Sequence, residues 1–284
     1  MDISYGIFFG IIAMMSWGVS DFFVTKSTRG CDPFRAFLWS QIIALIILFA
    51  IFFIFLETPK FSFNIVGLIL LSAFFTVIAN LAFYKSLKVG KVSIVMPVAS
   101  CWAVVTVLLS LIFLNQSLTQ NRVVGVVLAI AGAVLVSFSW KDLKKLKNHA
   151  DGVNYAVIAA LAYGIDFVFI DLMANRIGWF FPILFTGLVT ACFLSVYAGM
   201  SGKDISFPKK VWHFIILVGI LDTVAYLFYS SSVTTVYGAV MAPIAASSPA
   251  VSILLAKIFF KEKIEMHQEI GIALVIIGLI LLSI

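Results

Sequence analysis

Charge is what this sequence has least of. Only 11% of its 284 residues are charged and 63% are hydrophobic, whereas a soluble domain carries about 25% charged and about 45–50% apolar residues. This composition excludes an ordinary cytosolic enzyme, a nucleic-acid-binding domain and a disordered protein. The net charge of +6 predicts no nucleic-acid partner, because membrane proteins commonly carry basic cytoplasmic loops. The chain is expected to lie in the lipid bilayer.

Residues for metal, disulfide or covalent chemistry are also scarce. Three cysteines are too few for a disulfide framework. The three histidines, His149, His213 and His267, fall in loops or at helix ends and form no H-E-x-x-H zinc motif. No basic segment precedes the first apolar stretch, as it would in a cleaved signal peptide. We therefore expect no cofactor, no metal and no catalytic residues, and these absences disfavour an intramembrane enzyme.

What the sequence does have is a series of long apolar segments separated by short polar breaks. A membrane-spanning helix takes about 20 apolar residues. The segments lack the alternation of barrel strands, and isolated strands would leave backbone groups unpaired in lipid, so we interpret each segment as a helix. The ten predicted helices are 4–25, 36–56, 64–86, 92–114, 121–139, 152–174, 180–199, 211–232, 237–260 and 267–284.

The two halves of the chain resemble each other. When the sequence is shifted by 146 residues, glycines coincide at four positions, where chance gives about half a coincidence. The coinciding pairs, with one proline pair, are Gly6 with Gly152, Gly18 with Gly164, Gly125 with Gly271, Gly132 with Gly278 and Pro97 with Pro243. The repeating unit therefore contains five helices.

An odd number of helices makes the second copy cross the membrane in the opposite sense. The predicted fold is an all-α integral membrane protein with ten transmembrane helices in two inverted five-helix repeats, an arrangement typical of secondary transporters. We assign residues 1–140 to the first repeat, 141–151 to a basic linker and 152–284 to the second repeat.

Lysine and arginine are unevenly divided between the two ends of the predicted bundle. The loops after odd-numbered helices, with their flanks, hold 16 of the 19 basic residues. By the positive-inside rule this end is cytoplasmic, which leaves both termini extracytoplasmic. We expect a multi-pass protein of the cell membrane.

Several motifs resemble those of a known transporter family. They are Trp17-Gly18 in the first helix, Phe83-Tyr84-Lys85-Ser86-Leu87 at the end of the third, and a proline early in the fourth helix of each copy (Pro97 and Pro243), followed by spaced glycines in the fifth. In order, spacing and duplication, these motifs resemble the EamA-type repeat of the drug/metabolite transporter superfamily. Glu262 stands where the family has a glutamate after the fourth helix, and Gln116 replaces it in the first copy.

The resemblance implies a central cavity, alternating access and a substrate that differs between members. Members export amino acids and drugs, take up choline-like compounds, or exchange sugar phosphates and nucleotide sugars. The resemblance also implies cytoplasmic termini, which conflicts with the distribution of basic residues. We follow the distribution of basic residues on this point.

Four aspartates interrupt the apolar segments, where an ionisable group costs at least about 2.5–3.5 kcal/mol. Asp222 is the deepest, Asp166 lies in the sixth helix and Asp21 toward one end of the first, while Asp171 is nearer a membrane end. A deep carboxylate could pair with an ammonium group of the substrate or exchange a proton. A hydrogen bond that ties two helices together is the structural alternative.

Aromatic residues accompany these aspartates. An aromatic box around a carboxylate suits an organic cation, although 15% of the chain is aromatic and packing alone would also explain many of these residues. A helix proline permits a kink and suggests gating. The candidate substrate-binding residues are Trp17, Asp21, Asn80, Trp102, Tyr163, Asp166, Asp222, Tyr226, Tyr229 and Ser247, and the candidate gating residues are Pro97, Pro243 and Pro249.

Together these features predict a secondary active transporter. It would move a small polar or cationic metabolite, such as an amino acid, an amine or a drug-like compound, by alternating access, with protons as a candidate coupling ion. A lipid-head-group flippase of the same fold is the alternative. The expected partners are the small-molecule substrate and the lipid bilayer, and the chain is expected to be a monomer or a homodimer.

Overall fold

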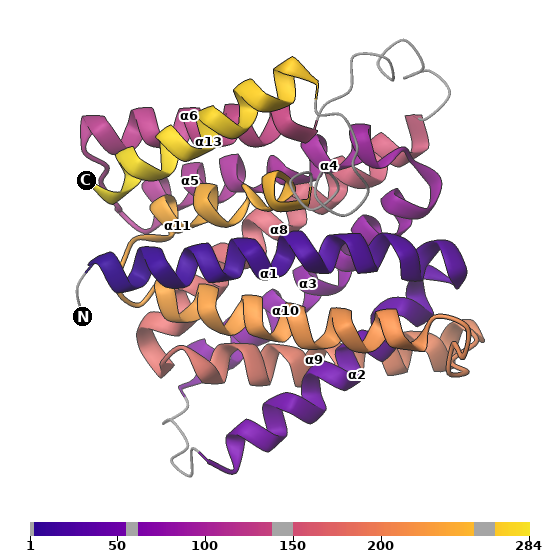
Figure 1. The fold of residues 1–284 in the computed structure, drawn as a ribbon. Coiled ribbons are helices and arrows are strands. Elements are labelled where there is room, and N and C mark those ends of the chain that lie inside the picture. The colour runs from indigo at the N-terminus through magenta and orange to yellow at the C-terminus, as the bar shows by residue number, and fades with distance from the viewer. Residues whose placement is uncertain (1–2, 55–61, 138–149, 253–264) are drawn as a thin grey trace.

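The computed structural model describes residues 3–54, 62–137, 150–252 and 265–284. Within these ranges every regular element is a helix and no strand is found (Figure 1). The helices are α1 (Ile3–Gly30), α2 (Pro33–Phe52), α3 (Phe63–Val89), α4 (Val92–Ser100), α5 (Trp102–Phe113), α6 (Gln120–Ser137), α8 (Ala150–Ile177), α9 (Phe180–Ser201), α10 (Trp212–Ser232), α11 (Gly238–Ala245) and α13 (Met266–Ser283).

The helices are long and apolar enough for the membrane fold that the sequence predicts. In the described ranges, eight helical segments have the length and composition of a membrane span, and Gln120–Val136 is a shorter apolar helix. The all-α membrane fold is confirmed. Part of the predicted ninth helix, 237–260, and most of the predicted linker, 141–151, lie outside the described residues, so the repeat boundaries stay a prediction.

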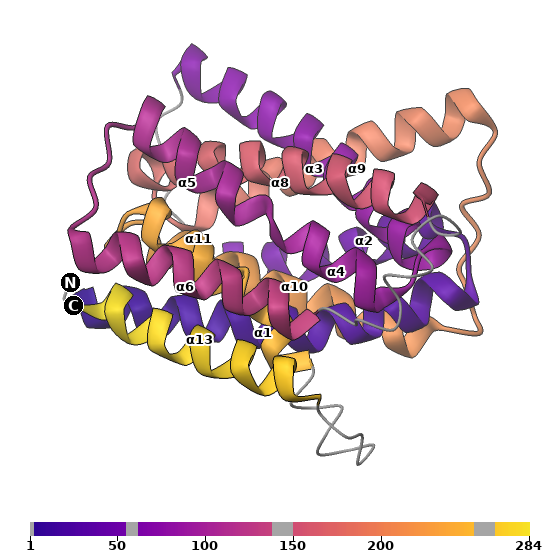
Figure 2. The ribbon, with the colours of Figure 1, turned by 90° about the horizontal axis from the view of Figure 1, so that it is seen from above.

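The helices pack in pairs that relate the two copies. α1 packs along α10, α3 along α8, and α6 along α13 (Figure 2). In the repeat, α8 corresponds to α1, α10 to α3 and α13 to α6. Exchanging the two copies therefore converts the α1–α10 pair into the α8–α3 pair and leaves the α6–α13 pair unchanged. This is the packing expected for copies related by a pseudo-two-fold axis. Both termini lie at the same end of the bundle.

The glycines that coincide in the sequence lie where the copies meet. A Cβ on Gly132 would lie 2.7 Å from the carbonyl oxygen of Gly271, and a Cβ on Gly125 would lie 3.0 Å from that of Gly278. The backbones of α6 and α13 therefore touch directly, which is the role of small residues between membrane helices.

Gly18 and Gly164 are also equivalent in structure. The hydroxyl of Thr106 donates to the carbonyl of Gly164 over 3.0 Å, and the hydroxyl of Ser252 donates to the carbonyl of Gly18 over 2.6 Å. Thr106 and Ser252 are themselves 146 residues apart. The same hydrogen bond between helices thus occurs once in each half of the molecule.

The predicted continuous helix 92–114 is broken in the structure. α4 ends and α5 begins on either side of Cys101, whose amide donates to a carbonyl three residues back, over 3.2 Å. The carbonyl of Pro97 instead accepts from the Cys101 thiol. The second copy repeats this turn, because Ser247 donates its amide three residues back over 3.2 Å and its hydroxyl to the Pro243 carbonyl over 2.8 Å.

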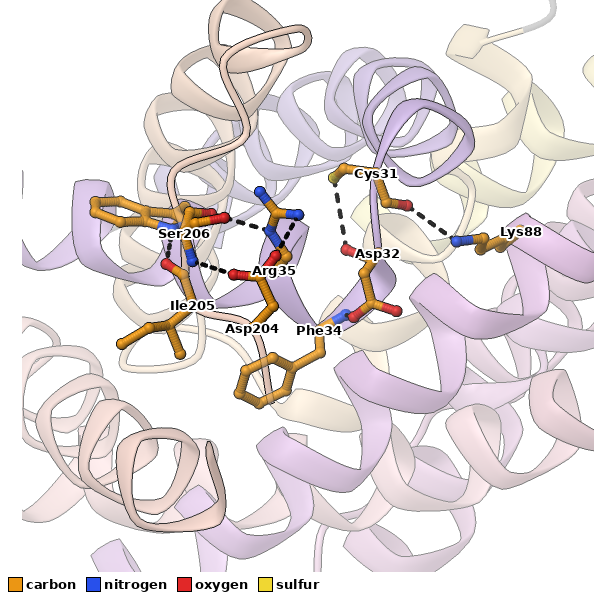
Figure 3. Close-up of polar contacts among 9 residues, drawn as sticks. Cys31, Asp32, Phe34, Arg35, Lys88, Asp204, Ile205 and Ser206 are labelled. Carbon is orange, nitrogen blue, oxygen red and sulfur yellow. Dashed lines mark hydrogen bonds and ion pairs between the residues drawn. The ribbon is translucent and has the colours of Figure 1, made fainter. Parts of the chain in front are cut away.

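Two loops, one at 31–32 and one at 202–211, lie beside the start of α2 and the end of α3 at the end of the bundle opposite the termini (Figure 3). Arg35 at the start of α2 forms an ion pair of 2.8 Å with Asp204 and donates to the carbonyl of Ser206 over 2.9 Å. Lys88 at the end of α3 donates to the carbonyl of Cys31 over 3.1 Å. The Ser206 amide, and then the Arg35 guanidinium, lower the pKa of the Asp204 carboxyl. This is the end that the basic residues predict to be cytoplasmic.

Candidate functional site

A cavity, which we call the central cavity, lies between helices of both copies. Its volume is about 70 Å³, and about 10–15 Å³ suffices for one water molecule, so it has room for roughly five. Its walls come from α1, α3, α4, α5, α8, α10 and α11, and from Ser248. The lining residues are Trp17, Asp21, Val24, Asn80, Phe83, Tyr84, Met96, Ala99, Ser100, Trp102, Tyr163, Phe167, Asp222, Tyr226, Ala245 and Ser248.

Two of the predicted aspartates line this cavity. Asp21 comes from α1 and Asp222 from the middle of α10, and each is partly accessible. The two carboxylates are close enough to interact electrostatically. The hydroxyl of Ser20 donates to Asp222 over 2.6 Å. No Lys, Arg or His lines the cavity among the described residues, so the cavity carries negative charge whenever these carboxylates are ionised.

Asp166, the third predicted aspartate, lies outside the central cavity and is fully buried. The hydroxyl of Ser72 donates to one of its carboxylate oxygens over 2.5 Å, and the hydroxyl of Thr76 donates to the other over 2.8 Å. Both oxygens are thus bonded to α3. Asp166 ties α8 to α3, as the structural alternative for a buried aspartate requires.

Asp166 and Asp222 make equivalent contacts in the two halves of the molecule, but the helix that carries the carboxylate and the helix that carries the hydroxyl are exchanged. Ser20 and Asp166 are 146 residues apart, as are Thr76 and Asp222. In one half of the molecule a hydroxyl on α1 donates to a carboxylate on α10. In the other half a hydroxyl on α3 donates to a carboxylate on α8.

The aromatic candidates form one cluster. Trp17, Trp102, Tyr163 and Tyr226 line the cavity, and Phe167, which the sequence analysis did not single out, joins them. Its ring stacks on Trp102 with centroids 4.2 Å apart and on Tyr226 at 5.9 Å. Phe167 is the repeat partner of Asp21, so the 146-residue shift contained the signal that would have identified it.

Tyr229 and Ser247 are the two candidates that support the cavity from outside. Tyr229 is fully buried, and its ring packs against Phe167 at 4.7 Å. Ser247 is also buried and bonds the Pro243 carbonyl. The cavity is lined instead by its neighbour Ser248, the repeat partner of Trp102.

Asn80 is held in place by two hydrogen bonds. Tyr163 donates its hydroxyl to the Asn80 side-chain oxygen over 2.9 Å, and the Asn80 amide donates to the main-chain carbonyl of Thr76 over 3.0 Å. These bonds join α8 and α3 beside the cavity and fix the direction of the amide.

The candidate gating prolines lie next to the cavity walls. The residues of α4 that follow Pro97 line the cavity, as does Ala245 at the end of α11 just after Pro243. Pro249 lies in the helical stretch that follows the second break. A change in bend at either break would therefore move the cavity wall; gating itself stays a prediction.

Asp171 belongs to a separate buried network. It is 2% exposed and accepts from the amides of Gln116 and Asn175, over 2.8 Å each. The oxygen of Gln116 accepts from the amide of Ala239 over 3.0 Å. The residue that replaces the family's glutamate in the first copy therefore joins α8 to the start of α11.

A second cavity, which we call the side cavity, adjoins the central one. Its volume is about 60 Å³, and Asn80, Asp222 and Tyr226 line both cavities. Its other lining residues are Phe37, Ser40, Gln41, Ala44, Leu48, Thr76, Ile170, Ile183, Thr186, Gly187, Thr190 and Thr223.

A polar cavity enclosed by two inverted copies of a helical unit defines a multi-pass membrane transporter. The model of the EamA-like transporter family matches residues 4–138 and 151–284. The chain belongs to this family, as its motifs predict.

Several known proteins are similar to this chain. An uncharacterized transporter of Archaeoglobus fulgidus is 24% identical over 212 residues, 72% of this chain and 71% of that protein. An uncharacterized protein of Methanocaldococcus jannaschii is 32% identical over 133 residues, 47% of this chain and 96% of that protein. A solved crystal structure superposes with a TM-score of 0.79 over 98% of both chains at 17% identity, which shows the same fold.

Proposed function

We propose that this transporter carries a small polar or cationic metabolite through the central cavity by alternating access. The observation that carries the proposal is the pair of partly accessible carboxylates, Asp21 and Asp222, in a cavity lined by aromatic rings. A positively charged group would pair with the carboxylates, and the faces of Trp17, Trp102 and Tyr226 would attract it further. An anionic substrate would meet repulsion in the same place.

The size of the cavity supports alternating access. Space for about five water molecules is too small for most metabolites, so the cavity would have to widen to take up a substrate. The paired breaks at Cys101 and Ser247 give each copy a point at which the wall can bend. Bending at one break would open the cavity to one side of the membrane, and bending at the other would open it to the opposite side.

The test is Asp222→Asn in the full-length protein, purified and placed in proteoliposomes. Candidate substrates come from a ligand screen by thermal shift, and uptake is then measured under two pH gradients. We expect Asp222→Asn to abolish uptake while expression and folding stay normal, since asparagine keeps the size and an oxygen that accepts from Ser20.

The matched control is Asp204→Asn, which removes a carboxylate that is exposed in a loop. This variant should transport at the wild-type rate. Normal uptake by Asp222→Asn would remove that carboxylate from the mechanism. Uptake that responds to the pH gradient would identify protons as the coupling ion. Movement of lipid without uptake of any soluble compound would identify a flippase instead.

A further inference from the structure

Several hydroxyl groups that line the side cavity already donate their hydrogens to other atoms of the protein. Ser40 donates to the Phe37 carbonyl over 2.9 Å, and Thr223 donates to the Gly219 carbonyl over 2.6 Å. A hydroxyl that donates in this way still has oxygen lone pairs for another partner. Such a wall accepts hydrogen bonds or coordinates a cation better than it binds an anion.

The remaining hydroxyls of the side cavity follow the same pattern, with one exception. Thr76 donates to Asp166, and Thr186 contacts the Ser72 oxygen at 3.5 Å. Thr190 is fully buried, and its hydroxyl has no hydrogen-bond partner among the described residues. A buried hydroxyl without a partner costs about 1–3 kcal/mol. Ser110, Tyr229 and Ser230 share this feature among the described residues, but of these four only Thr190 lines the side cavity or the central cavity, where a ligand can reach its oxygen.

Among the described residues, Asp222 is the one charged side chain that lines the side cavity. No other ionisable carboxyl, and no Lys, Arg or His, lines it among the described residues. Gln41 contributes an amide, whose nitrogen donates to the Gly187 carbonyl over 3.3 Å. Carboxylate, hydroxyl and amide oxygens are the ligands that hard cations prefer, and apolar side chains such as Leu48 and Ile183 form the rest of the wall. A volume of about 60 Å³ suits an ion with few waters.

We propose that the side cavity binds a sodium ion between α2, α9 and α10, held by the oxygens of Thr190, Ser40 and Asp222. The ion would sit on one side of Asp222 while the central cavity lies on the other. It would neutralise the carboxylate on which a cationic substrate depends, so ion and substrate would compete. The role as a coupling ion rests on the proposed function, whereas the ion site itself does not.

The test uses the purified full chain and sodium alone, without substrate. Thermal unfolding is followed while NaCl replaces KCl at constant ionic strength, and binding of radioactive sodium is measured directly. We expect a saturable rise in unfolding temperature with sodium and none with potassium. The absence of any sodium-specific effect in the wild-type protein would overturn the proposal.

Two variants locate the site and replace no residue that lines the central cavity, although Ser40 contacts the hydroxyl of Tyr84 at 3.3 Å. Thr190→Val keeps the side-chain shape but removes the hydroxyl, and Ser40→Ala removes a second oxygen. Each should weaken sodium binding by about tenfold, equivalent to about 1.4 kcal/mol. The matched control is Ser110→Ala, since Ser110 is also buried without a hydroxyl partner among the described residues but lies outside the side cavity. It should bind sodium like the wild type.

Unchanged sodium binding in Thr190→Val and Ser40→Ala would place the ion elsewhere and refute the side-cavity site. The two proposals fail separately. If Asp222→Asn abolishes transport but the wild type shows no sodium effect, the transport proposal stands and the ion site falls. If sodium binds as described but Asp222→Asn transports normally, the ion site stands and the transport proposal falls.

Discussion

The contact between α6 and α13 gives the sharpest prediction about stability. Gly271 lies so close to α6 that an added Cβ would be 2.7 Å from the amide nitrogen of Val136 and 2.9 Å from the carbonyl oxygen of Gly132. An ordinary contact at such a Cβ is 3.4–4 Å. Gly271→Ala must therefore push the two helices apart by about 0.7 Å over their closest approach.

The size of the effect follows from two opposing contributions. Overpacking costs about 1–3 kcal/mol, and the upper part of that range applies because the atoms in the way are backbone and cannot rotate aside. Alanine favours the helix over glycine by about 1 kcal/mol. The net expectation is that Gly271→Ala lowers the free energy of unfolding by about 1–2 kcal/mol.

The assay is thermal unfolding of the purified protein in detergent, with Gly67→Ala as the control. Gly67 lies within α3, and a Cβ there would meet nothing within 4 Å, so only the gain in helix propensity applies. We expect Gly67→Ala to unfold at or slightly above the wild-type temperature and Gly271→Ala to unfold below it. If both variants unfold at the same temperature, the close glycine contact is not what holds these helices together.

Two further predictions concern an aspartate and a cysteine. Asp166→Asn should destabilise the protein by about 1–3 kcal/mol in the same assay, because the new amide nitrogen would face a hydroxyl that donates to a carboxylate oxygen in the wild type. Asp222→Asn should unfold near the wild-type temperature. An equal loss of stability in both variants would contradict this prediction. With Cys101 and Cys192 replaced by alanine, a membrane-impermeant maleimide should label Cys31 only from the cytoplasmic side. Labelling from the outside would show that the protein has the opposite orientation in the membrane. Because burial raises the pKa of the Cys31 thiol above its ordinary 9.0 and the thiolate is the reactive form, labelling should still be accelerating at pH 9.

Much of the fold could be predicted because each membrane helix is specified by the residues of its own segment. Long apolar runs specify membrane helices wherever they occur, and coinciding glycines mark backbone contacts that admit no side chain. The break at Cys101 was harder to predict. A proline such as Pro97 permits a kink, but the chain breaks four residues later, where the Cys101 thiol replaces its amide as the donor to the Pro97 carbonyl.

The site was predictable in part for a different reason. Asp222 stands out because an ionisable residue in the middle of an apolar helix needs a partner or a function. Sequence spacing does not show which helices become neighbours, so it could not distinguish Asp222 from Asp166 or find Thr190. Ser20, the hydroxyl that holds Asp222, resembles other serines in apolar helices except that the repeat aligns it with Asp166.

The two aspartates differ in the number of hydroxyl groups that donate to them. In the first copy Ser72 and Thr76 both donate to Asp166, so that both carboxylate oxygens are used for packing. Among the described residues only one side-chain hydroxyl, that of Ser20, donates to Asp222. A near-symmetric scaffold thus leaves one carboxylate with bonding capacity to spare, and it does so where the two cavities meet. The proposed binding site is therefore marked by a difference between the two halves, namely the number of hydroxyl groups that donate to each aspartate.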